Sequence, residues 1–140
     1  MSVRKLLFIL MIRLSEILTE LHTGRPLKQI VYRGDDTDFN AFDHKFIGRA
    51  TMSNTEGFWF SSDPEAAQYF GQLVRKFEIT MNNPLVFTDE DFRQTYHGPP
   101  HFARLAKQRG HDGVVIKNIV DGDMVSDVYC VWNIEQIKKL

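Results

Sequence analysis

The most informative stretch of the sequence, residues 57–69, reads Gly57-Phe58-Trp59-Phe60-Ser61-Ser62-Asp63-Pro64-Glu65-Ala66-Ala67-Gln68-Tyr69. Aromatic side chains favour β-structure, so residues 57–61 are predicted to form a strand. Side chains alternate between the two faces of a strand, which places Phe58 and Phe60 on one face. Trp59 and Ser61 then share the opposite face.

A short helix is predicted to begin directly after this strand. Ser62 or Asp63 can cap its N-terminus, and Pro64 suits its first turn. Gly71 is predicted to end the helix, because glycine is the usual residue just past a helix C-terminus. Tyr69 therefore falls about two turns into the helix.

Trp59, Ser61 and Tyr69 together predict an aromatic slot with a hydroxyl group at its edge. Such a slot binds a flat heteroaromatic ring by stacking. Each residue taken singly is explained as well by a core tryptophan or a helix-capping serine. The combination makes this region a candidate ligand site.

The rest of the chain predicts a small α+β fold in which short strands and short helices are interleaved. Helices are expected at 5–22, 62–70, 88–91 and 99–109, and further strands at 29–33, 73–79, 84–87, 113–117 and 127–132. Residues 35–56 show no periodicity, and loops of this length are commonly functional. We expect this segment to close over a ligand and to help select a target.

Length and composition limit the classes of protein that the chain can represent. The 140 residues, 43% of them hydrophobic, suit a single folded domain spanning 1–140. A formal net charge of -1 lacks the basic excess of a general nucleic-acid binder, so no nucleic-acid partner is expected. Cys130 is the one cysteine, which excludes an internal disulfide. The apolar run at 6–12 is too short to cross a membrane. We expect a cytoplasmic protein without a membrane partner.

Two further segments combine polar side chains with strand ends. In Tyr32-Arg33-Gly34, an arginine beside a glycine suits a phosphate, although a surface arginine before a turn has the same pattern. In the last predicted strand, Asp127 and Val128 point to opposite faces, so at most one faces a site. The histidines and acidic residues show no metal-ligand spacing, and no metal is expected.

In this order and spacing, the three segments resemble the ADP-ribosyltransferase superfamily. The likeness is to the diphtheria-toxin and poly(ADP-ribose) polymerase branch, and to small ADP-ribosyltransferase domains of phage and polyvalent mobile-element proteins. It rests on three motifs, namely Val31-Tyr32-Arg33-Gly34, Gly57 to Tyr69, and Asp127-Val128-Tyr129 with the ending Glu135-Gln136-Ile137-Lys138. It covers residues 30–140, preceded by an N-terminal helical segment at 1–25.

The resemblance implies two small antiparallel sheets that form a cleft for NAD as co-substrate, flanked by short helices. Arg33 is implied to bind the pyrophosphate or ribose, Trp59 and Tyr69 to sandwich nicotinamide, and Ser61 to hold its ribose. Backbone hydrogen bonds to the nicotinamide amide are implied for Gly34. Tyr32 and Ser62 complete the implied cofactor-binding set.

The catalytic glutamate of the family falls on Val128, whose side chain has no charge to stabilise the developing positive charge on the ribose. Asp127 is the adjacent carboxylate, and a β-bulge is one way to turn it into the cleft. The predicted catalytic residues are therefore Arg33, Ser61 and Asp127. The implied function is mono-ADP-ribosylation of a protein target by a phage- or mobile-element-encoded enzyme. The alternatives are a catalytically silent binding or inhibitory module, or an NAD glycohydrolase.

Overall fold

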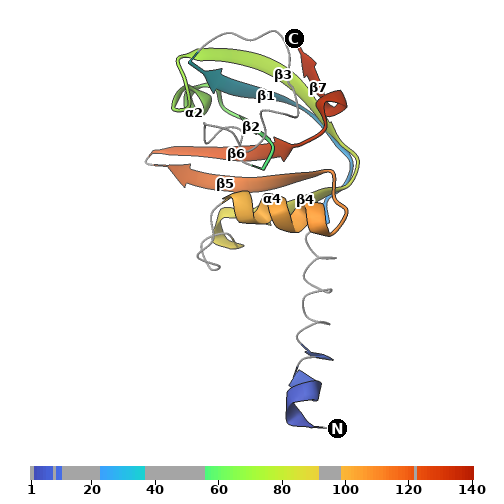
Figure 1. Cartoon of the computed structure of the whole chain (residues 1–140). Coiled ribbons are helices and arrows are strands. Elements are labelled where there is room, and N and C mark those ends of the chain that lie inside the picture. The colour runs from blue at the N-terminus through green and yellow to red at the C-terminus, as the bar shows by residue number, and fades with distance from the viewer. Residues whose placement is uncertain (1, 8, 11–22, 37–55, 92–98, 122) are drawn as a thin grey trace.

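Seven strands form one mixed sheet in the order β4-β5-β6-β2-β1-β3-β7 (Figure 1). The computed structural model describes residues 2–7, 9–10, 23–36, 56–91, 99–121 and 123–140. The strands are β1 (Leu27–Asp35), β2 (Phe58–Ser61), β3 (Leu73–Met81), β4 (Pro84–Thr88), β5 (Gly113–Asp121), β6 (Met124–Val131) and β7 (Ile137–Lys139). The helices are α2 (Pro64–Gln68), α4 (Pro99–Gln108) and the 3-10 helix η3 (Ile134–Gln136). The predicted α+β class is confirmed.

The single mixed sheet differs from the two small antiparallel sheets that the family resemblance implied. Strand β2 pairs with β6 along its whole length but meets β1 at the single register position Tyr32↔Ser61. This short contact joins β4-β5-β6-β2 to β1-β3-β7. Strand β4 runs parallel to β5, because α4 provides the crossover connection that a parallel pair needs. The strand β2 itself was predicted, but its pairing with β1, which joins the strands into one sheet, was not.

Aromatic side chains build the core on one side of β2, as the alternation predicts. Phe58 and Phe60 are 1% and 3% exposed, and the Phe60 ring meets that of Phe77 edge-on at 5.5 Å. On the opposite face of the sheet, α4 buries Phe102 against Leu85 and other residues of β4 and β5. Figure 1 shows this helix lying along the two strands. The two clusters fix β2 and β6 from both sides, and these strands carry the predicted site.

The predicted helix start after β2 is confirmed. Asp63 is the N-cap, since its Oδ1 accepts the backbone N–H of Glu65 at 2.8 Å, and Pro64 occupies the first turn. The helix ends at Gln68, so Tyr69 lies at its C-cap and not inside it. Gly110, with φ 79°, follows α4 as expected.

Several predicted elements lie partly or wholly outside the described residues. Residues 3–7 and 9–10 are helical, but the rest of the predicted 5–22 helix is not described. The predicted loop at 35–56 is described only at its two ends. Thr88 and Asp91 make the expected reciprocal cap, in which each accepts the backbone N–H of the other.

Candidate functional site

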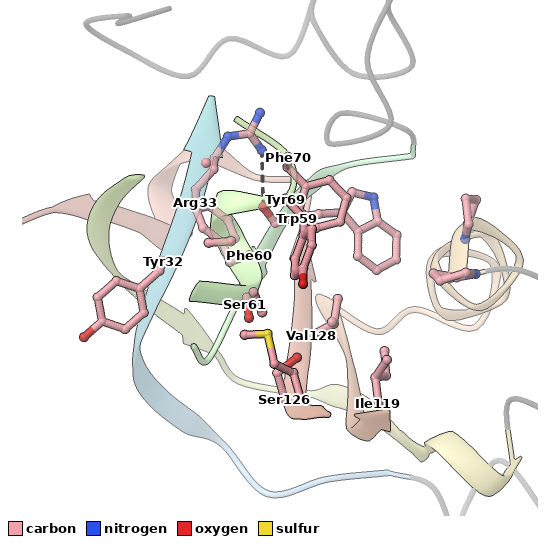
Figure 2. A pocket seen from close by; sticks show the side chains of 16 residues that line it. Tyr32, Arg33, Trp59, Phe60, Ser61, Tyr69, Phe70, Ile119, Ser126 and Val128 are labelled. Carbon is pink, nitrogen blue, oxygen red and sulfur yellow. Dashed lines mark hydrogen bonds between the residues drawn. The ribbon is translucent and has the colours of Figure 1, made fainter. Parts of the chain in front are cut away.

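A pocket of about 240 Å³ opens between β1, β2, the end of α2, the β5–β6 hairpin and the start of α4. This volume lies somewhat below the range of roughly 300–1,000 Å³ for whole drug-sized ligands, so the pocket suits a small ligand or one part of a larger one. Figure 2 shows the side chains that line it. They are Tyr32, Arg33, Gly34, Trp59, Phe60, Ser61, Ala66, Ala67, Tyr69, Phe70, Pro99, Pro100, Ile119, Met124, Ser126 and Val128.

One side of the pocket is aromatic. Trp59, Tyr69 and Phe70 gather there, as Figure 2 shows, while Ser126, Ile119 and Val128 lie on the other side. Tyr69 is 73% exposed and Phe70 57% exposed, so both rings are accessible for a ligand to cover. Trp59 and Tyr69 were predicted to lie together, and the pocket contains both.

Arg33 is almost completely buried, at 3% exposure, and is not the surface arginine that its motif alone permits. Its Nε donates to the two carboxylate oxygens of Asp35 at 3.2 and 3.1 Å. Its Nη1 donates to the backbone oxygen of Trp59 at 3.3 Å, the bond drawn in Figure 2. Burial lowers the pKa of Arg33, and the Asp35 carboxylate opposes this change. The guanidinium is thus held in one orientation at the pocket wall.

Gly34 lines the pocket for a reason that the sequence did not indicate. A Cβ at this position would overlap the carbonyl oxygen of Ala67 and come within 2.6 Å of that of Gly71. The glycine therefore allows the end of α2 to pack directly on β1. This close approach places Tyr69 and Phe70 at the pocket.

Ser61 and Tyr32 both line the pocket from neighbouring strands. The Ser61 side chain is 5% exposed, and its Oγ accepts the backbone N–H of Asp63 at 3.1 Å. This bond orients the hydroxyl at the point where β2 turns into α2. Tyr32 faces Ser61 in register, but Figure 2 shows its ring directed away from Trp59.

Two predicted site residues, Ser62 and Asp127, are not in the pocket lining. They bind each other, because Ser62 N–H donates to the Asp127 carbonyl and Asp127 N–H donates to Ser62 Oγ, both at 2.9 Å. These bonds extend the contact between β2 and β6 beyond Ser61. The pair therefore has a structural explanation in strand pairing.

The chain does contain a β-bulge next to Asp127, but it lies on the partner strand β5, between Ile116 and Ile119. Asn118, with φ 60°, is in the bulge, and its backbone N–H donates to Asp127 Oδ1 at 2.9 Å. Asp127 thus binds the bulge, whereas Val128 on the opposite face of β6 lines the pocket. The bulge leaves Asp127 facing away from the position that the catalytic prediction needs.

Other catalytic groups are scarce in the part of the chain that the structure describes. The pocket lining there includes one charged side chain, Arg33, and no carboxylate. The described residues hold no group of three or more histidine, cysteine or acidic residues able to bind a metal. Burial raises the pKa of the Cys130 thiol far above its usual range, so it is protonated at neutral pH and unsuited to be a nucleophile. No described helix is long and apolar enough to cross a membrane.

Comparison with known protein families assigns the chain to one of them. A family model described as ADP-ribosyltransferase in polyvalent proteins matches residues 22–140. The chain belongs to this ADP-ribosyltransferase family. No curated protein and no solved structure matches it. The match includes every strand of the sheet and every residue of the pocket.

Asp127 provides the first test of site residues in this ADP-ribosyltransferase domain. Asp127→Asn keeps an oxygen that can accept the Asn118 N–H, so stability and any transferase activity are expected to stay close to wild type. Asp127→Ala removes the acceptor and is expected to lower the free energy of unfolding by about 1–3 kcal/mol. Denaturant unfolding measures both. A large loss of activity in a stably folded Asp127→Asn variant would instead support the catalytic assignment made from the sequence.

Proposed function

We propose that this domain is a mono-ADP-ribosyltransferase that uses NAD and modifies a protein target. The observation that carries the proposal is one pocket in which exposed aromatic rings, a buried arginine and an oriented serine hydroxyl meet. Stacking suits nicotinamide, a hydroxyl suits its ribose, and a guanidinium suits the pyrophosphate. Family membership supports the reaction class.

In the proposed reaction, the bond between the nicotinamide nitrogen and ribose C1′ breaks and its electron pair leaves with nicotinamide. A nucleophilic side chain of the target then bonds to C1′ and loses a proton to solvent or a neighbouring base. Trp59 and Tyr69 hold the leaving ring, Ser61 holds the ribose, and Arg33 holds the phosphates. Positioning of this kind lowers the barrier by fixing the reactants in a productive geometry.

A second function, NAD binding without transfer, is favoured by Val128. This residue lines the pocket where the family resemblance requires a carboxylate, and the adjacent Asp127 does not. A pocket whose described lining has no carboxylate can bind NAD but lacks an anion to stabilise the developing positive charge. Such a domain acts as a binding or inhibitory module.

Incubation with labelled NAD distinguishes three outcomes, namely transfer of ADP-ribose to a protein, binding of NAD without transfer, and hydrolysis of NAD. The protein is incubated with NAD labelled in the ADP-ribose part, with and without cell lysate. Transfer is expected to give labelled protein only when lysate is present. Free labelled ADP-ribose without labelled protein indicates a glycohydrolase. Intact NAD together with measurable NAD binding supports the silent module, and absence of binding would refute the proposed use of the pocket.

Tyr69→Ala tests the stacking slot without disturbing the core, because Tyr69 is 73% exposed. The variant is expected to bind NAD with a free energy of binding that is weaker by about 1–3 kcal/mol, the scale for one aromatic stacking partner. Isothermal titration calorimetry measures the change. Trp59 packs partly against the α4 core, so a loss of affinity in Trp59→Ala counts only after its stability has been measured.

Ile30→Ala is a matched control for Tyr69→Ala, since Ile30 is also exposed, at 42%, and is not in the pocket lining. It is expected to bind NAD as wild type does. Unchanged NAD affinity in Tyr69→Ala would exclude Tyr69 from the binding site.

A further inference from the structure

A second serine, Ser126, lies in the pocket on the same strand as Val128. The two residues are two positions apart on β6, so their side chains share one face, and both line the pocket. Ser126 is half-buried, and its hydroxyl makes no hydrogen bond with any described residue. In the view of Figure 2 it lies below Ser61, on the side of the pocket away from Trp59.

Ser61 and Ser126 lie on either side of the Val128 position. Ser61 is the direct cross-strand partner of Val128, and Ser126 precedes Val128 by two residues. Among the described residues the Ser61 hydroxyl makes one hydrogen bond, in which its oxygen is the acceptor, so its O–H is left to donate. Two neutral hydroxyls therefore lie in the region where the pocket lacks a carboxylate.

We propose that Ser61 and Ser126 form a neutral subsite for the sugar hydroxyls of a nucleoside whose base stacks on the Trp59–Tyr69 wall. A hydroxyl can both donate and accept, which matches the hydroxyl groups of a ribose. Such a subsite holds the sugar without placing a negative charge beside it. It rests on the proposed function and adds a residue, Ser126, to the nucleoside site.

The distinguishing measurement compares two probes, nicotinamide and nicotinamide riboside, which differ by the ribose. Ser126→Ala is expected to weaken nicotinamide riboside binding by about 2- to 10-fold, the effect of losing one neutral hydrogen bond. Its affinity for nicotinamide is expected to stay unchanged. Ser126→Thr retains a hydroxyl and is expected to recover most of the riboside affinity. Titration calorimetry at a temperature well below unfolding gives the dissociation constant of each protein for each probe.

Val125→Ala is the control, because Val125 is 58% exposed, lies on the opposite face of β6 and is not in the pocket lining. It is expected to bind both probes as wild type does. If wild type binds the riboside but Ser126→Ala binds it equally well, or loses both probes equally, the subsite is wrong and the proposed function stands. If wild type binds neither probe nor NAD, the proposed function fails and the subsite with it.

Discussion

Val128→Glu is expected to raise the rate of NAD cleavage by about 10²–10³-fold, the scale for one preorganised electrostatic stabiliser. Val128 lines the pocket and is the cross-strand partner of Ser61, so a carboxylate there lies beside the proposed ribose position. As the bond to nicotinamide breaks, positive charge develops on the ribose, and a nearby anion stabilises it most in the transition state. Release of nicotinamide from NAD, followed by chromatography, measures the rate.

Val125→Glu is the matched control for this gain. It adds the same side chain to the same strand, but on the opposite and exposed face. Its cleavage rate is expected to equal that of wild type. If both variants gain equally, net charge and not position explains the effect, and if a folded, NAD-binding Val128→Glu gains nothing, the stabilising charge belongs elsewhere.

The wild-type rate gives the Val128→Glu result its functional meaning. A wild type that binds NAD but does not cleave it, combined with an active variant, identifies a silenced transferase with an intact pocket. A wild type that transfers ADP-ribose, combined with a variant that mainly hydrolyses NAD, shows that Val128 helps to exclude water from the acceptor position. In the active wild type, Val128 then acts by filling space and excluding water from the site.

The parts of the fold that were predictable depend on neighbours in sequence. Alternation along β2, the Asp63 cap and Pro64 in the first turn follow from rules that span a few residues. The sheet was harder, because one contact between Tyr32 and Ser61 decides whether its strands form one sheet or two. Nothing local in the sequence encodes that contact.

The candidate site was predictable where a residue's face follows from its strand. Trp59, Ser61 and Arg33 were predicted site residues, and all three line the pocket. Ser126 was missed although it shares a face with Val128, and its position two residues earlier was a signal that could have identified it.

The contacts between residues far apart in the sequence that shape the site could not be predicted from the sequence. Gly34 is required because the Ala67 carbonyl oxygen occupies the space that a Cβ would need. The bulge that binds Asp127 lies on another strand. Asn118 offered one hint, because asparagine tolerates positive φ better than most residues. Its partner, however, emerges only from the register of β5 against β6.

Arg33→Lys is expected to lower both stability and NAD affinity, for two separable reasons. Lysine keeps the charge but loses the planar fork that binds Asp35 through Nε and the Trp59 carbonyl through Nη1. The free energy of unfolding is expected to fall by about 3 kcal/mol, the lower end for a disrupted buried ion pair. From its sequence motif alone, Arg33 looks like a ligand-binding residue that stability does not need. Its burial beside Asp35 shows why stability is expected to change as well.

Comparing ligands separates the two roles of Arg33. If the guanidinium contacts the phosphates, Arg33→Lys is expected to weaken NAD and ADP-ribose binding by about 10- to 100-fold, as for a lost charge-assisted hydrogen bond. Nicotinamide has no phosphate, so its affinity is expected to stay the same in variant protein kept well below its unfolding temperature. Equal losses for nicotinamide and ADP-ribose would instead show that Arg33 shapes the pocket through Asp35 and the Trp59 backbone. Unchanged affinity for ADP-ribose would assign Arg33 to the fold alone, because a buried arginine that touched the phosphates could not be replaced by lysine without loss.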